Sequence, residues 1–435
     1  MPDIPFGFAL PGGQPPDPND PQQMQQFMAQ LQQLLATPGS GPVNWDLARQ
    51  VAASQLSSAG DPAVTPYERN AVEEALRLAD LWLDPASAHP SGIQTSVAWN
   101  RNEWIYRTLD VWKKLCDPVA GRMVAAMGDL VPPEARSQLG PMQSMLTTLG
   151  GALFGGQLGQ ALGSLAAEVL SAGDIGLPLG PAGTAALLPA NIRAYGEGLE
   201  LPEDEVRLYV ALREAAHQRL FQHVPWLRGH VLTTVEMYAT GITVNREAIE
   251  EAMGRLDPMN PESMQALSVE GIFTPEDTPT QKASLARLET TLALVEGWVC
   301  HVVDSAAAER LPNVNRLAEA FRRRRAAGGP AEQTFAALVG LELRPRRLRE
   351  AAALWAALTE HRGIAGRDAL WGHPDLLPAE EEFADPEAFA RSQLDLGDLD
   401  DFDFGGTGSG NDSGDTGAGD DSGEPGPDSS GRTPE

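Results

Sequence analysis

The sequence predicts a mainly α-helical fold with at most a small sheet and disordered termini. Three observations favour this fold: several long segments carry apolar residues at helical spacing, several of them begin with helix-initiating residues, and both ends of the chain are rich in Pro, Gly and polar residues. The prediction divides the 435 residues into a disordered N-terminal segment at 1–42, a helical domain at 43–375 and a disordered acidic tail at 376–435.

The two ends of the chain have different compositions. Residues 1–40 are rich in Pro, Gly and Gln, and within them only residues 22–35 could form a short helix. From Asp375 to Glu435 the chain carries 18 acidic residues and two arginines among many Gly and Ser. Such a tail cannot bury enough apolar surface to become ordered. Removing residues 380–435 is therefore expected to leave the melting temperature nearly unchanged.

The overall composition restricts the class of protein. A formal net charge of −28 argues against binding of nucleic acid or an anionic membrane over the whole surface. The two cysteines, Cys116 and Cys300, cannot form a disulfide framework and suit a reducing compartment. The first residues have no basic and apolar stretch typical of a secretory signal, so we expect a cytoplasmic protein. A peptide or protein is the expected partner, and the oligomeric state stays open.

The helical patterns lie at residues 65–83, 95–115, 145–170, 202–222 and 279–310. Thr65 and Pro66 are typical of a helix start, and Thr278 is the expected N-cap of the last helix. Residues 145–170 are glycine-rich and include polar side chains, which favours a buried packing helix over a membrane span. Residues 185–192 could form a short extended segment, in which Pro189 allows at most an edge strand.

The most informative motif is Glu214 and His217, which form an E-x-x-H pattern on the helix at 202–222. A zincin helix carries two histidines four residues apart, with a glutamate after the first that acts as general base. Here Arg213 occupies the position of the first histidine, and a guanidinium has no lone pair for a metal. Taken alone, the pattern is more typical of an ordinary i,i+3 Glu–His pair.

A longer stretch resembles a known family. Residues 213–227, REAAHQRLFQHVPWL, resemble the signature of a bacterial family of zincin-like zinc-dependent metalloproteases and hydrolases, in the branch where arginine replaces the first histidine. Further similarity lies at residues 44–45, 168–170, 188–191 and 294–298, so that it covers about residues 43–375. The resemblance implies a zincin-like helical domain with zinc as a possible cofactor. It also implies that Glu214 is the base and that His217 and Glu296 are ligands.

Glu296 lies in an otherwise apolar run, where a carboxylate needs either a metal or a charged partner. Two alternatives stay open: metal ligation, or an ion pair with an arginine such as Arg213. On a straight helix Cys300 and Asp304 fall within about 80° of Glu296. Asp304 is thus a weaker candidate ligand.

Two further histidines are weak candidates. His301 lies about 140° around the helix from Glu296, so it can line the site and pair with Asp304 instead of sharing a metal. His223 follows His217 by six residues and points elsewhere, unless the helix breaks before Pro225.

The basic run at residues 322–325 is expected to be a solvated helix end, with docking of the acidic tail as the alternative. Two functions remain open. The chain is either a zinc-dependent metallopeptidase with a degenerate R-E-x-x-H motif, or a catalytically inactive zincin-fold protein that acts as an interaction module. Whether it is an enzyme depends on what Arg213 does.

Overall fold

A computed structural model describes residues 41–129, 140–240, 242–244, 273–275, 279–326 and 347–392. All of these belong to one compact unit, residues 1–392. The expected helix at 22–35 and the chain after residue 392 lie outside the described residues.

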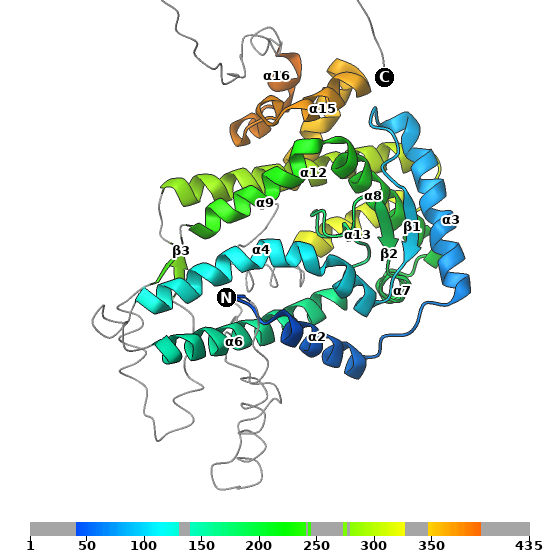
Figure 1. The fold of residues 1–435 in the computed structure, drawn as a ribbon. Helices are drawn as coiled ribbons and strands as arrows, with labels where there is room; N and C mark the ends of the chain where they lie inside the picture. The colour runs from blue at the N-terminus through cyan, green and yellow to red at the C-terminus, as the bar shows by residue number, and fades with distance from the viewer. Residues whose placement is uncertain are drawn as a thin grey trace, which may run out of the picture. The chain divides into compact units, whose positions relative to one another are not determined.

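The predicted fold class is confirmed, because helices dominate and the strands are few and short (Figure 1). The helices are α2 (Trp45–Ala59), α3 (Pro66–Leu83), α4 (Arg101–Asp129), α6 (Gly140–Ala166), α7 (Pro189–Glu197), α8 (Glu203–His223), α9 (Pro225–Thr240), α12 (Pro279–Ala307), α13 (Val314–Ala326), α15 (Leu348–Asp368) and α16 (Pro386–Arg391). The strands are β1 (Thr95–Ala98), β2 (Thr184–Leu187), β3 (Ile242–Val244) and β4 (Phe273–Pro275).

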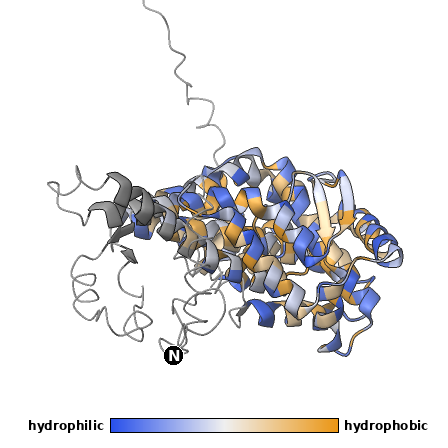
Figure 2. Ribbon diagram, turned by 60° about the horizontal axis from the view of Figure 1, so that its bottom comes forward, coloured by the Kyte–Doolittle hydropathy of each residue, from blue (hydrophilic) through white to orange (hydrophobic). Residues whose placement is uncertain are grey.

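Helix α8 runs through the core and packs against α3 on one side and α12 on another (Figure 1). Its residues are buried without interruption from Tyr209 to Phe221, so it has no solvent-facing stripe in that stretch. Along the more peripheral helices hydrophobic and hydrophilic residues alternate (Figure 2). Because α8 is enclosed on all sides, each of its charged side chains needs a partner inside the protein.

The helix expected at 95–115 begins later than the sequence predicts. Thr95–Ala98 forms β1, which pairs in parallel with β2, from Thr95 opposite Thr184 to Ala98 opposite Leu187. Helix α4 starts only at Arg101, where the Asn100 side chain accepts a hydrogen bond from the Glu103 amide at 2.8 Å. The extended segment expected at 185–192 ends at Leu187, because Pro189 is the first residue of α7.

The glycine-rich helix α6 lies beside α2 (Figure 1). A β-carbon added at Gly159 would lie 2.4 Å from the Ala48 carbonyl oxygen of α2. The glycines therefore allow a close approach between two helices, as expected for a packing helix. No helix within the described ranges is both long enough and apolar enough to cross a membrane.

The folded chain continues past residue 375, where the sequence places the start of the tail. A 3₁₀ turn at Glu380–Ala384 and helix α16 follow, and both Phe383 and Phe389 are buried. Arg362 of α15 donates hydrogen bonds to the carbonyls of Phe389 and Ala390, at 2.7 and 2.8 Å. Apolar side chains at 383 and 389 within an acidic stretch explain the difference.

We predict that substitution of Gly159 by alanine destabilises the protein by about 1–3 kcal/mol, because the added methyl group overpacks the contact with α2. Gly156→Ala is the matched control, since a β-carbon there meets no atom within 4 Å. The control should be neutral or stabilising by up to about 1 kcal/mol, through helix propensity. Urea unfolding of both variants measures this, and equal stabilities would show that the α2–α6 contact is not close.

We also predict different effects for two truncations. Ending the chain after Ser392 should leave the melting temperature nearly unchanged. Ending it after Ala379 should lower the melting temperature by several degrees, since fully burying a phenylalanine contributes about 1.5–3 kcal/mol. Calorimetry of the two truncated proteins distinguishes these outcomes. Identical melting temperatures would mean that α16 adds no stability.

Candidate functional site

The residues that the sequence singles out come from two long helices that cross the core. Arg213, Glu214 and His217 lie in the buried middle of α8, and Glu296 lies in the buried middle of α12. Three acidic residues, Glu203–Glu205, occupy the first turn of α8, at the positive end of its dipole. Pro225 begins the next helix directly after α8 ends at His223.

The Glu296 carboxylate is surrounded by three nitrogen donors. Arg213 Nη2 lies 2.6 Å from Oε2, while His217 Nε2 and Arg325 Nη2 lie 2.9 and 3.0 Å from Oε1. Glu296 and His217 are each only 1% exposed, and Arg213 is 4% exposed. We call Arg213, His217, Glu296 and Arg325 the Glu296 cluster. The ion pair with Arg213 was one of the two alternatives that the sequence left open.

The electrostatics of Glu296 favour its charged form. Burial alone would raise its pKa, but the charges of Arg325, His217 and Arg213 outweigh burial and hold the pKa well below its usual range. An ionised carboxylate can only accept hydrogen bonds, so His217 Nε2 carries the proton in their contact. Arg213 is further enclosed by the Phe321 ring, whose centroid lies 5.2 Å from the guanidinium carbon.

Glu214 belongs to a different set of contacts. Its Oε2 accepts a hydrogen bond from the Gly173 amide at 2.8 Å, and its Oε1 accepts one from Gln218 Nε2 at 2.9 Å. The side chain is fully buried, and burial raises the pKa of this carboxyl. A general base must reach a water molecule or a substrate proton. Here both oxygens of Glu214 are occupied, and solvent does not reach them.

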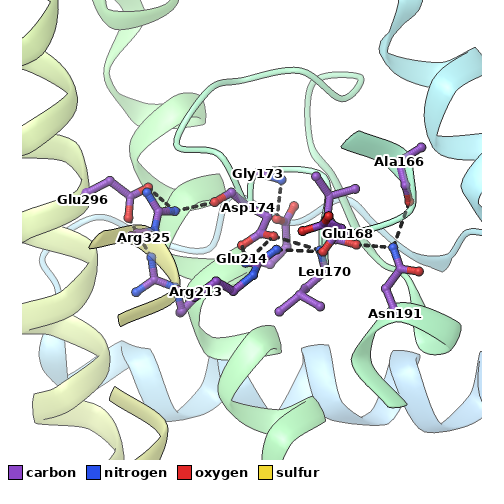
Figure 3. Close-up of polar contacts among 12 residues, drawn as sticks. Ala166, Glu168, Leu170, Gly173, Asp174, Asn191, Arg213, Glu214, Glu296 and Arg325 are labelled. Carbon is purple, nitrogen blue, oxygen red and sulfur yellow. Dashed lines mark hydrogen bonds and ion pairs between the residues drawn. The ribbon is translucent and has the colours of Figure 1, made fainter. Parts of the chain in front are cut away.

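A tight turn covers both carboxylates (Figure 3). Two arginines of α13, Arg324 and Arg325, bind this turn. Gly176 has a φ of +79°, and a β-carbon there would lie 2.6 Å from Glu296 Oε1. Arg324 pairs with the Asp174 carboxylate at 2.9 Å, and Arg325 donates to the Asp174 carbonyl while it also pairs with Glu296. The site is closed by its own chain.

The expectation that residues 322–325 form a solvated helix end is wrong for two of them. Arg322 and Arg323 do pair locally with Glu319. Arg324 and Arg325 point inward, because two buried carboxylates on other segments attract them. Sequence reasoning therefore missed Arg325 and Asp174 as members of the site. Two features of the sequence could have indicated them. The arginine run has too few acidic residues nearby to pair with every arginine, and Asp174 lies in a G-D-I-G turn.

The structure does not bring the weaker candidates to the cluster. His223 lies at the end of α8, where its Nε2 contacts the Ser91 carbonyl at 3.1 Å. His301 Nε2 contacts Thr359 Oγ1 at 2.8 Å rather than pairing with Asp304. Asp304 lies two turns beyond Glu296 on α12, with one carboxylate oxygen buried and without a hydrogen-bond partner among the described residues.

The donors present do not fit a catalytic zinc ion. Such a site needs three protein ligands, and of the described residues only His217 and Glu296 are at hand, with their donor atoms 2.9 Å apart. Two ligands of a tetrahedral zinc with bonds of about 2.0–2.1 Å lie roughly 3.3 Å apart. A zinc-bound imidazole also normally donates from its second nitrogen, whereas His217 Nδ1 is buried with no partner in the described part of the chain.

The same conclusion follows from the charges. Both oxygens of Glu296 already accept from cations, and a dication placed there would meet two guanidinium groups. Among the residues that the structure describes, no group of three or more His, Cys, Asp and Glu is placed to hold a metal ion.

The chain is similar to one family of known proteins. A family model described as zincin-like metallopeptidase matches residues 43–390. No curated protein is similar enough to count as a match. The fold is shared with the crystal structure of a "putative hydrolase with a novel fold" from Chloroflexus aurantiacus, with a TM-score of 0.55 and 21% identity over 80% of this chain and 97% of that one. From residue 43 to residue 390, this chain belongs to the zincin-like metallopeptidase family.

Proposed function

We propose that this chain is a non-catalytic member of its family, in which guanidinium groups replace the zinc ion and the fold serves as a binding module for a peptide or protein. The observation that carries the proposal is the saturation of Glu296. Arg213, at the position of the first zincin histidine, reaches the carboxylate that would otherwise be the third ligand. A zinc-bound water has no place in this arrangement.

The buried ion pairs around the site support the proposal. The guanidinium groups of Arg213, Arg324 and Arg325 face the carboxylates of Glu296 and Asp174, and Glu214 is satisfied by neutral donors. Removing one partner of a buried ion pair destabilises a protein by about 3–5 kcal/mol. Opening the site to a substrate would break several such contacts together. The Glu296 cluster thus stabilises the folded domain by joining its helices through ion pairs.

A second candidate function is a zinc-dependent hydrolase. It is favoured by one observation: Glu214, His217 and Glu296 all stand at the positions where the family resemblance implies a base and two ligands. In that case Arg213 and Arg325 must withdraw from Glu296, and His223 or Asp304 must supply a third ligand. Zinc binding distinguishes the two candidates.

We predict that the wild-type protein binds no stoichiometric zinc, and that Arg213→His combined with Arg325→Gln binds about one zinc per chain, because the double variant has two histidines and a glutamate with free lone pairs. Arg213→His alone should bind more weakly, since Arg325 still occupies Glu296. Elemental analysis after dialysis against zinc gives the stoichiometry.

Arg213→Gln combined with Arg325→Gln is the control, since it removes both guanidinium groups without adding a ligand. Circular dichroism confirms that each variant is folded. About one zinc in the wild type would favour the hydrolase. No zinc in any folded variant would remove the support for a zincin site on α8.

We further predict that Glu296 makes stability depend on pH. Its folded-state pKa is depressed, so its contribution is fully present above the unfolded pKa of about 4.3 and is lost as the pH falls below that value. Glu296→Gln should lower the free energy of unfolding at pH 7 by about 3–5 kcal/mol, and the difference from wild type should narrow between pH 5 and pH 3. Denaturant titrations at each pH measure this.

The matched control is Glu360→Gln, which makes the same chemical change at an exposed position of α15. Its difference from wild type should stay small at every pH. Parallel pH curves for wild type and Glu296→Gln would contradict the depressed pKa of Glu296.

A further inference from the structure

An open cavity of about 650 Å³ lies between α12, α13 and α15, outside the Glu296 cluster. This volume is in the range of sites for small ligands. Its walls combine acidic, basic and small apolar side chains, among them Asp304, Glu319, Arg322, Arg349 and Ala352. Neither the family match nor the zincin motif assigns a role to it.

One wall of the cavity carries an acceptor that lacks a donor. Asp304 Oδ1 is buried, and no hydrogen bond or ion pair joins the Asp304 side chain to the described residues. Its expected partner His301 contacts Thr359 instead. Burial of an acceptor without a hydrogen-bond donor is unfavourable. The Asp304 side chain as a whole is partly exposed and lines the cavity, so a cationic group of a ligand can pair with its carboxylate from the cavity side.

Two positively charged side chains, Arg322 and Arg349, line the same cavity. Arg349 is exposed, and within the described ranges it has no ion pair or hydrogen bond. Arg322 uses its Nε for Glu319, at 3.2 Å. These two guanidinium groups would repel a purely cationic ligand, and Asp304 and Glu319 would repel a purely anionic ligand. A ligand that carries both charges can place each charge beside a side chain of opposite charge.

We infer that this cavity binds a zwitterion, with a primary ammonium group that donates to Asp304 and a carboxylate that pairs with Arg349. Free amino acids and short peptides with a free amino end share this chemistry. Leu348 and Ala352 give the cavity an apolar wall for a short aliphatic side chain. The inference goes beyond the proposed function, because it concerns a different cavity and does not depend on whether zinc is bound.

Cys300 provides a reporter for the cavity. Its side chain lines the wall and is partly exposed, and Arg213 Nη1 lies 3.4 Å from its sulfur. The other thiol, Cys116, is completely buried, and burial raises its pKa far above the usual range. A thiol reagent should therefore modify Cys300 and leave Cys116 of the folded protein unmodified.

The test follows iodoacetamide labelling of both cysteines by mass spectrometry, with leucylglycine as the probe. At ten times its dissociation constant, leucylglycine should slow the labelling of Cys300 about tenfold. N-acetyl-leucylglycine, which lacks the ammonium group, should give no protection, and leucylglycine amide should protect less. Protection by leucine as well assigns the site to free amino acids, and protection by leucylglycine alone assigns it to peptide amino ends; both support the inference.

Two variants complete the test. Asp304→Asn and Arg349→Gln should each abolish protection, and Glu360→Gln, outside the cavity, should keep it. If Asp304→Asn fails to fold, the exposed Arg349 still provides a folded variant. The inference is overturned if neither leucine nor leucylglycine protects Cys300, if the acetylated peptide protects equally, or if folded Asp304→Asn or Arg349→Gln retains protection.

Discussion

A carboxylate buried in an apolar helix must be neutralised where it stands, and the arrangement around Glu296 follows from that requirement. Glu296 lies on α12, and its partners come from two other elements: Arg213 and His217 from α8, and Arg325 from α13. The same Arg325 also holds the turn that contains Asp174. The interaction thus fixes the relative positions of the helices that form the centre of the domain.

Buried arginines are used in the same way elsewhere in the domain. Arg219 of α8 pairs with Asp80 and Asp84 at 2.7 and 2.6 Å, which joins α8 to α3. Arg367 pairs with Asp368, and Asp368 accepts a hydrogen bond from Trp298 of α12 at 2.8 Å. The planar, permanently charged guanidinium suits such sites, because it satisfies several acceptors at once. Arg213 is therefore one of several buried arginines that stabilise the domain through ion pairs.

The sequence predicted the features that depend on local interactions. Helix α3 begins where Thr65 and Pro66 indicate, and Thr65 and Glu68 form the reciprocal hydrogen bonds of a capping box. It predicted less where distant segments meet. Residues 95–98 form a strand only because they pair with residues 184–187, and Arg325 reaches Glu296 only in the folded chain. Periodicity and charge runs do not contain the information about which distant segments meet.

In the proposed non-catalytic protein, a guanidinium occupies the position of the zinc ion. The most direct measurement is an anomalous difference map, recorded at the zinc absorption edge, from crystals of the wild-type protein soaked with zinc. We expect no anomalous peak between His217 and Glu296, with the Arg213 guanidinium still paired to the carboxylate. A peak bonded to both side chains, with Arg213 displaced, would contradict it.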